Sequence, residues 1–292
     1  MELPGKVVVV TGAARGLGAE LARQLTAKGA TVALLGLEPE ELQKVSAELH
    51  GSAWWEVDVT DSAALDRVAQ EVRETLGQAY AVIANAGIAA GGPLLLADPA
   101  TYDRVITVNL LGSVRTVRAF LPQVLASKGY VLQIASVAAL VPAPMMGAYC
   151  ASKAGAEAFA LSLRGEVRPH GAKVGVAYLT WTDTDMVRGA DARPGLGTMR
   201  AKLPGLLGRT YPVEPAVARL VEGVVHRRAR VYAQGWVRGL SWARAVMPSL
   251  MAAAPTRDVR RVEAEIRAAG TAATTAVGAG GAADRSATDQ RG

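Results

Sequence analysis

Residues 7–18 read VVVVTGAARGLG, and this stretch decides the fold. Four consecutive valines are typical of a strand that is buried on both faces of a parallel sheet. Three glycines follow at once, Gly12, Gly16 and Gly18, and the chain then takes up helical spacing. Glycines at such a turn let a diphosphate approach the backbone, and the N-terminus of the next helix favours an anion. The stretch therefore predicts a dinucleotide site, although its spacing departs from the usual Gly-x-Gly-x-x-Gly fingerprint.

The alternation of a short apolar run with an amphipathic stretch continues along the chain. Apolar runs follow at residues 31–35, 53–57, 80–84, 130–135 and 173–179, and helical spacing is found at 16–28, 39–49, 62–76, 99–127 and 147–168. Strands joined by right-handed helical crossovers form a doubly wound sheet. We therefore predict an α/β fold, a Rossmann-type doubly wound parallel sheet of about seven strands with helices on both faces. A C-terminal extension follows it.

Length and charge suggest how the chain is divided. Half of the 292 residues are apolar and a fifth are charged, which is ordinary for a globular protein. We predict a dinucleotide-binding and catalytic domain at 1–235, a basic and aromatic helical extension at 236–268, and a flexible Gly/Ala-rich tail at 269–292. Nine arginines and three acidic residues lie between His226 and Arg267, which accounts for the whole net charge of +6. Since the rest is neutral, no nucleic-acid-binding surface is expected.

Two stretches without charged residues, 75–97 and 129–152, are long enough to be mistaken for membrane spans. Asn85 interrupts the first, and Pro142 and Pro144 interrupt the second, which suits a buried strand followed by a loop. The N-terminus has no basic segment followed by a long apolar one, so we expect no secretory signal. The single Cys fits a reducing compartment. We expect a cytoplasmic protein.

A second chemical signal is the segment Tyr149-Cys150-Ala151-Ser152-Lys153. Tyr and Lys four residues apart share one face of a helix. A nearby ammonium favours the phenolate and lowers a phenol pKa that is normally about 10. The pair therefore suggests a proton-transferring tyrosine, although an accidental pair on a helix gives the same spacing.

Together these residues resemble the classical short-chain dehydrogenase/reductase family over about residues 5–235. The resemblance implies a catalytic tetrad of Asn109, Ser136, Tyr149 and Lys153. It also implies a nicotinamide cofactor whose contacts are Thr11, Gly12, Arg15, Gly16, Leu17, Gly18, Gly36, Asp58, Val59, Asn85, Ala86, Gly87, Tyr149, Lys153 and Thr184.

The resemblance also implies a role for each catalytic residue. Tyr149 exchanges a proton with the substrate oxygen, and Ser136 holds that oxygen by a hydrogen bond. Lys153 binds the nicotinamide ribose and favours the tyrosinate, and Asn109 keeps a water in a proton relay. The cofactor carries the hydride, and no metal is expected.

The first departure from the family pattern concerns the cofactor. Gly36 and Leu37 stand where relatives that prefer NAD usually have Asp, so this position offers no carboxylate to repel a 2′-phosphate. Arg15 can meet that phosphate, which favours NADP(H) slightly. Glu38, however, can serve the ribose instead.

The second departure is Leu179-Thr180-Trp181, where the family often has Pro-Gly after the sixth strand. We predict an apolar substrate pocket that includes Ala138, Met145, Trp181 and Met186, with Leu140 and Met146 nearby. Residues 185–212 are rich in Gly, Pro and large apolar side chains, and we interpret them either as a cover over the pocket or as a plain surface connection.

The third departure is the basic segment 226–267, which includes Arg227, Arg228, Arg230, Trp236 and Trp242. It suits a helix that packs on the body or on a second subunit. It also suits an interfacial helix on an anionic membrane, or a docking face for an acidic partner such as an acyl carrier protein.

We therefore predict an oxidoreductase that transfers a hydride between NAD(P)(H) and a hydroxyl or carbonyl group of an apolar substrate. A ketone, a lipid, a steroid and a ketoacyl thioester all fit. The alternatives are a ketoacyl-carrier-protein reductase and a non-catalytic dinucleotide-binding protein. The family resemblance implies a homo-oligomer.

Overall fold

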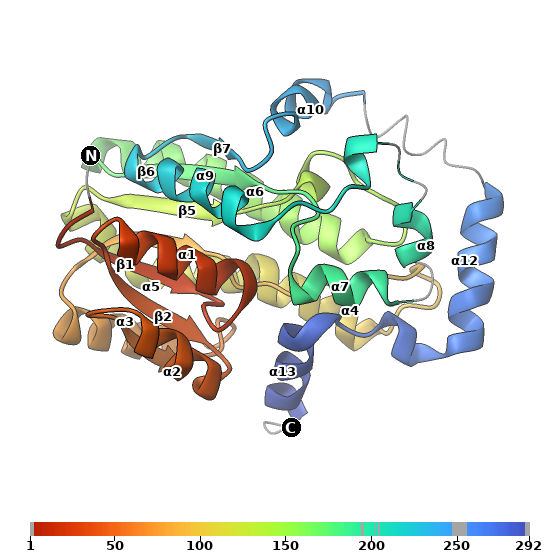
Figure 1. Cartoon of the computed structure of the whole chain (residues 1–292), viewed down its shortest axis with the longest axis horizontal. Coiled ribbons are helices and arrows are strands. Elements are labelled where there is room, and N and C mark those ends of the chain that lie inside the picture. The colour runs from red at the N-terminus through yellow and green to blue at the C-terminus, as the bar shows by residue number, and fades with distance from the viewer. Residues whose placement is uncertain (1–2, 194–195, 202, 204, 247–255, 290–292) are drawn as a thin grey trace.

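The computed structural model describes residues 3–193, 196–201, 203, 205–246 and 256–289. One sheet runs through them, and its order is β3-β2-β1-β4-β5-β6-β7, with every neighbouring pair parallel (Figure 1). In these described ranges the seven strands are β1 Val7–Thr11, β2 Thr31–Gly36, β3 Ala53–Glu56, β4 Ala79–Ala84, β5 Tyr130–Ile134, β6 Lys173–Tyr178 and β7 Arg230–Tyr232. The predicted Rossmann-type sheet is confirmed.

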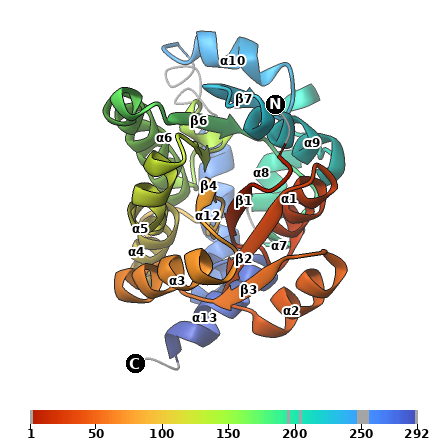
Figure 2. The same cartoon turned by 90° about the vertical axis from the view of Figure 1, so that its left-hand side faces the viewer.

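Helices cover both faces of this sheet, as Figure 2 shows. One face carries α1 (Gly16–Ala27), α2 (Pro39–Glu48) and α9 (Val213–Val225), and the other carries α3 (Ser62–Thr75), α5 (Ser113–Ala126) and α6 (Gly147–Val167). Successive side chains of a strand point to opposite faces. Val8 and Val10 accordingly belong to the first core and Val7 and Val9 to the second.

The stretch predicted as one helix over 99–127 is helical throughout, but its middle is wider than an α-helix. It consists of α4 (Pro99–Ile106), a π-helical segment (Thr107–Gly112) and α5. Asp98 begins it by accepting a hydrogen bond from the Thr101 amide at 2.8 Å, and Pro99 occupies the first helical position. Asn109 lies in the π-helical segment, a kind of irregularity that is frequent at functional sites.

The C-terminal extension returns to the body of the molecule. After α10 (Val237–Ala243), the helix α12 (Thr256–Ala269) buries Val262 and Ile266 against Met145 and Ala273. The packing of the extension on the body was one of the three interpretations of the basic segment, and α12 fits it. Trp242 of α10 is 82% exposed. Residues 247–255 of the predicted extension lie outside the described residues.

The predicted flexible tail at 269–292 is wrong for residues 271–289. A 3-10 turn (Thr271–Thr274) and a helix, α13 (Gly278–Asp289), follow α12, and both Val277 and Asp284 are buried. The small Gly and Ala residues allow the backbone to pack closely against α7 (Asp185–Asp191). The Gly/Ala-rich composition therefore did not predict that residues 271–289 pack on the body, because their burial depends on residues that are distant in the sequence. Residues 290–292 lie outside the described part.

Among the described residues, none of the helices combines the length and the apolar character needed to cross a bilayer. The two uncharged stretches that resemble spans contain β4 and β5, each followed by a loop.

Candidate active site

The glycine turn joins β1 to α1 at the C-terminal edge of the sheet. Gly12 and Gly16 have φ of +64° and +51°, a region that favours glycine, and a Cβ on Gly18 would collide with the Gly12 carbonyl. Arg15 precedes α1 in an extended conformation, and no described side chain caps the helix. Because the first amides of a helix lack internal partners, they are free to bind an anion. The turn therefore fits a diphosphate.

The ends of β1 and β4 are tied together beside this turn. The Thr11 hydroxyl accepts hydrogen bonds from the backbone amides of Asn85 and Ala86, both at 3.0 Å. The Asn85 side chain donates to the Thr11 carbonyl at 2.8 Å. Thr11 thus holds the neighbouring loop. The cofactor groove itself is lined by predicted residues, Gly12, Arg15, Gly16, Leu17, Gly18, Asn85, Ala86, Gly87, Tyr149, Lys153 and Thr184.

The end of the groove at which adenosine is predicted to bind is a separate pocket, and the predicted residues Gly36, Asp58 and Val59 line it together with Glu38. The Arg15 guanidinium forms an ion pair with Glu38, with Nε at 3.1 Å from Oε2, and also lies 3.6 Å from the Asp185 carboxylate. The cation that favours a 2′-phosphate is therefore already paired with a carboxylate.

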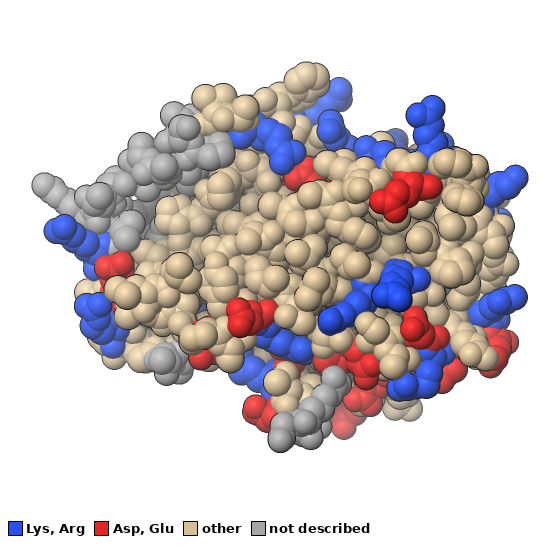
Figure 3. Space-filling view, turned by 180° about the vertical axis from the view of Figure 1, so that it is seen from behind, with Lys and Arg blue, Asp and Glu red and all other residues tan. Residues whose placement is uncertain are grey.

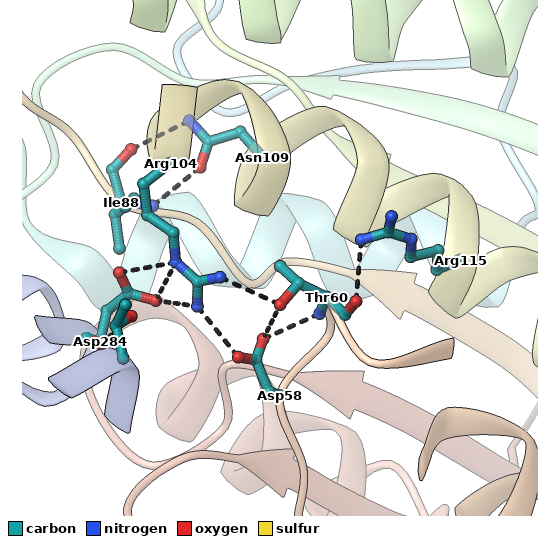
Figure 4. A network of polar contacts seen from close by, with 8 residues as sticks. Asp58, Thr60, Ile88, Arg104, Asn109, Arg115 and Asp284 are labelled. Carbon is teal, nitrogen blue, oxygen red and sulfur yellow. Dashed lines mark hydrogen bonds and ion pairs between the residues drawn. The ribbon is translucent and has the colours of Figure 1, made fainter. Parts of the chain in front are cut away.

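Asp58 is buried at this end in a network of polar contacts (Figure 4). Its Oδ1 accepts hydrogen bonds from the amide and the hydroxyl of Thr60, each at 2.8 Å, and its Oδ2 lies 3.0 Å from Arg104 Nη2. Burial alone would raise the pKa of Asp58, but these hydrogen bonds outweigh it and hold the pKa below its usual range. Arg104 also pairs with Asp284 at 2.7 Å.

Sequence reasoning missed Arg104 and Asp284. They are 180 residues apart, and neither belongs to a motif. Only the fold brings them together, so no local signal could have identified them.

The side chains predicted to be catalytic converge where β5 and α6 meet. Tyr149 and Ser136 both line the groove, and Ser136 Oγ accepts a hydrogen bond from the Ala138 amide at 3.1 Å and donates one to the Leu179 carbonyl at 3.4 Å. Lys153, one turn along α6, has its Nζ 5.8 Å from the Tyr149 ring centroid and donates to the Ile134 carbonyl at 3.1 Å. The structure thus places a phenol, a hydroxyl and an ammonium at one point.

Burial controls the proton affinities at this point. Burial raises the pKa of Tyr149 to about 12, and the nearby Ser136 side chain acts in the opposite direction. Burial also lowers the pKa of Lys153 to about 8. The sequence argument predicts a lowered tyrosine pKa; in this structure the removal of the phenol from water has the larger effect.

Asn109 supports the site from the π-helical segment. Its side-chain oxygen accepts a hydrogen bond from the Ile88 amide at 2.8 Å, and its amide nitrogen donates to the Ile88 carbonyl at 2.9 Å and to Ser152 Oγ at 3.0 Å. A Cβ on Gly87 would lie 3.0 Å from the Asn109 oxygen and 3.5 Å from Lys153 Nζ. Asn109 therefore fixes the loop after β4 beside Lys153. Its part in a water relay stays a prediction.

An apolar cavity adjoins the groove on the other side of Ser136 and Tyr149. Both residues line the cavity as well as the groove. The predicted residues Ala138, Trp181 and Met186 lie in its wall. The 185–212 segment also contributes Val187, Ala190, Asp191, Arg200, Leu203 and Leu207. Further wall residues are Ala89, Val137, Val141, Met146 and Val277.

Two of the residues predicted near the pocket lie elsewhere. Met145 has φ of +67° in the turn before α6 and packs against Val262 and Ile266 of α12. Leu140 is buried in the core between the sheet and α6. The positive φ at Met145 explains why its predicted place in the pocket is wrong, because the turn directs the side chains of Met145 and its neighbours to different sides of the chain.

The short chain dehydrogenase family model matches residues 6–194, which include β1 to β6 and all four positions predicted to be catalytic. This chain belongs to the short-chain dehydrogenase family. It is therefore an oxidoreductase with a nicotinamide dinucleotide cofactor.

Several known short-chain dehydrogenases are similar to it. Bovine (Bos taurus) dehydrogenase/reductase SDR family member 7B is 34% identical over 62% of this chain, a match that spans 59% of the bovine protein. The 3-oxoacyl-acyl-carrier-protein reductase FabG of Escherichia coli strain K12 is 29% identical over 75% of this chain and 91% of its own. A metagenomic short-chain oxidoreductase solved with NADP is 36% identical over 60% of this chain and 82% of its own, with a TM-score of 0.58.

Part of this short-chain dehydrogenase lies beyond the matched range. The elements α9, β7, α10, α12 and α13 all follow residue 194. Val277 and α13 nonetheless contribute to the walls of the cavity and the groove.

Proposed function

We propose that this protein transfers a hydride between NAD(P)(H) and the hydroxyl or carbonyl group of an apolar substrate. One observation carries the proposal: Ser136 and Tyr149 line both the dinucleotide groove and the apolar cavity. A proton-transferring group has to lie where the cofactor and the substrate meet, because positioning is the main contribution of the protein to such chemistry.

Each of the four proposed catalytic residues has its own role in this reaction. The bound dinucleotide supplies or accepts the hydride. In the reducing direction, the Tyr149 hydroxyl donates its proton to the carbonyl oxygen, and the Ser136 hydroxyl donates a hydrogen bond to the same oxygen. The Lys153 ammonium stabilises the tyrosinate that remains, and Asn109 holds the adjoining loop. In the oxidising direction the proton moves back to Tyr149.

The cavity favours an apolar substrate. Its wall consists mainly of Ala, Val, Leu and Met side chains together with Trp181. Its buried cation, Arg200, stacks on Trp181 with 4.6 Å between the guanidinium carbon and the ring centroid, and pairs with Asp191. Because this charge is balanced inside the protein, the substrate has no need to neutralise it. A ketone, a hydroxylated lipid or a steroid fits this description.

The preference between NADP(H) and NAD(H) depends on Arg15 and Glu38. Arg15 favours a 2′-phosphate, whereas the Glu38 carboxylate beside it repels a phosphate and can accept hydrogen bonds from ribose hydroxyls. The slight preference for NADP(H) stays a prediction.

Turnover by the wild type and by Tyr149→Phe tests the proposal. We expect oxidation of NADPH or NADH with apolar ketones, followed at 340 nm, and a loss of at least about 100-fold in kcat for the variant, because a positioned acid contributes 10²–10⁴-fold. Cofactor affinity should stay within a few-fold in calorimetry, since the phenol oxygen is the group removed. Turnover that survives the substitution would contradict the assignment.

A ketoacyl-carrier-protein reductase is the second candidate, favoured by the similarity to FabG. The structure places Arg227, Arg228 and Arg230 at the N-terminal end of β7, at the edge of the sheet opposite the groove. Arg227 also donates to the Lys128 carbonyl at 2.8 Å, next to the start of β5. A carrier bound to these arginines would be far from the cavity. We expect carrier-linked and free ketoacyl substrates to be reduced at equal rates. We expect this equality at low and at high salt.

A non-catalytic dinucleotide-binding protein is a third candidate, and the assembled site does not favour it. Dinucleotide binding alone needs no apolar cavity against Ser136 and Tyr149. Cofactor binding without turnover of any ketone in the panel would support it.

The implied homo-oligomer also has a suitable surface. Figure 3 shows a face with a broad central area free of charged side chains among the described residues, on the side that α5 and α6 cover. Uncharged side chains on these helices and just before α5 include Leu111, Val114, Leu121, Ala151, Ala154 and Ala158. We propose that a second copy of this chain covers this face.

A further inference from the structure

The helix α13 lies along the dinucleotide groove, although it is remote in sequence from the glycine turn. Gly280 and Gly281 line the part of the groove that contains Lys153. Gly280, Ala283 and Asp284 line the adenosine pocket. Gly280 therefore stands where the two parts of the groove meet, and α13 forms a wall of both.

The segment leading into α13 is fixed to the body by its backbone. The Val277 amide donates to the Ala89 carbonyl at 2.8 Å, and the Val277 side chain is 2% exposed. Gly278 then packs directly against α7, since a Cβ on it would collide with the Asp185 backbone, and a Cβ on Gly189 would collide with Gly278. This end of α13 is thus held by main-chain contacts that need no large side chain.

One ion pair holds the next turns of α13. Asp284 is 3% exposed, and its Oδ1 lies 2.7 Å from Arg104 Nη2. The same nitrogen lies 3.0 Å from Asp58 Oδ2, so the Arg104 guanidinium stands between two carboxylates, as Figure 4 shows. Arg104 therefore links α13 to the residue expected beside the adenine.

We propose that α13 is a cover of the cofactor site: a dinucleotide lies between it and the glycine turn, and leaves when Asp284 separates from Arg104. The inference rests on the proposed function, because it takes this groove as the place where the dinucleotide binds. It assigns Gly280, Ala283 and Asp284 to the cofactor site, in a part of the chain beyond the family match.

The side chains of α13 suit a helix that lies over the bound dinucleotide better than a helix that occupies the dinucleotide site itself. The groove residues of its first two turns are glycine and alanine, apart from Asp284. A Cβ built on Gly280 meets no atom of the described residues within 4 Å, so space remains on that side. A segment that blocks a site fills it with side chains, whereas this one leaves the groove open beneath it.

The dissociation rate of NADPH from the 292-residue protein tests whether the pairing of Asp284 with Arg104 retains the dinucleotide. Wild type, Asp284→Asn and, as a matched control, the exposed helical Asp66→Asn are loaded with NADPH and mixed with excess NADP⁺ in a stopped-flow fluorimeter. We expect dissociation about tenfold faster from Asp284→Asn, the effect of losing one charge-assisted hydrogen bond. Asp66→Asn should match the wild type. An unchanged NADPH dissociation rate in Asp284→Asn would contradict the proposal that the pairing of Asp284 with Arg104 retains the dinucleotide.

A second pair of variants tests whether the dinucleotide lies beneath α13. Gly280→Leu directs a side chain into the open space, and Gly165→Leu on α6 places the same side chain where a Cβ also meets no described atom. We expect Gly280→Leu to weaken NADPH and NADH binding at least about tenfold, the size of 1.4 kcal/mol. Both variants should keep the melting temperature of the wild type. Unchanged affinity in Gly280→Leu would contradict the assignment.

Hydrogen exchange of residues 278–289 shows whether α13 stays in place over the bound dinucleotide or is displaced by it. Added NADPH should slow this exchange in the wild type and slow it less in Asp284→Asn. Faster exchange on adding NADPH would mean that the dinucleotide displaces α13, and the cover would be wrong. A wild type that binds neither NADPH nor NADH would instead contradict the proposed function and the cover together.

Discussion

At the scale of single residues, Lys153 is a group of the site whose charge changes at a pH not far above neutrality. Its ammonium is buried beside Tyr149, and that burial lowers its pKa to about 8. The cation is therefore fully present below pH 7 and is lost as the pH rises through 8. A bound anionic dinucleotide favours the charged form and raises this pKa, so binding and protonation are linked.

We expect NADPH affinity to fall about tenfold between pH 7 and pH 9, the size set by linkage to one proton. Fluorescence titrations of the wild type at several pH values measure it. Lys153→Met should bind more weakly at pH 7 and show a flatter pH dependence. A wild-type affinity that does not change over this range would show that Lys153 keeps its charge or takes no part in binding.

Glu38 offers a second test at this scale. Glu38→Gln removes the carboxylate that pairs with Arg15 while the side chain keeps its size. We expect the ratio of NADPH to NADH affinity to rise about tenfold, because Arg15 becomes free to pair with the phosphate and a like charge is lost. Calorimetry with both cofactors measures the ratio. Arg15→Ala is the opposite control, and a fall in the ratio for Glu38→Gln would contradict this role.

At the scale of elements, α12 is attached to the body by a narrow apolar stripe. Val262 and Ile266 are 2% exposed, whereas Arg261 and Arg267 beside them are exposed. Such a helix owes its stability to its buried face, because an isolated helix of this length is marginal in water.

We expect Ile266→Ala to lower the free energy of unfolding by about 2–5 kcal/mol, the range for such cavities in a core. Arg267→Ala, its exposed neighbour, should change that energy by less than about 0.5 kcal/mol. Urea unfolding followed by circular dichroism measures both. Equal effects of the two substitutions would mean that α12 does not contribute its buried face to the folded state.

The elements also show where sequence reasoning succeeds. The valine run and its glycines led directly to β1, the turn and α1, because these signals are local. Buried strands and crossover helices are likewise periodic in sequence. The tetrad positions came from the family motifs, and their catalytic roles stay a prediction. Met145 could not be placed, since its direction depends on a positive φ in a turn. The tail 271–289 was misjudged because Gly and Ala reveal nothing about the partner they pack against.

At the scale of the whole molecule, the uncharged face of α5 and α6 makes a prediction about assembly. We expect the wild type to sediment as a dimer or a larger oligomer. Ala158→Arg, which adds a charge to the exposed part of α6, should shift it towards the monomer, since an unpaired charge in an interface is costly. Analytical ultracentrifugation over a range of protein concentrations measures this.

Gly165→Arg is the matched control for that change, because Gly165 is also exposed on α6, two turns nearer its C-terminal end. A wild type that sediments as a monomer would contradict the proposed assembly. Dissociation caused equally by both substitutions would place the interface further along α6.

The pairing of Arg104 with Asp284 joins positions 180 apart in the chain. Contacts of such long range form late in folding, since a large loop has to be closed before they stabilise anything. We expect a refolding chain to complete its sheet and its glycine turn first, and to acquire tight dinucleotide retention only in a later kinetic phase. Retention of the cofactor would then report the completion of folding.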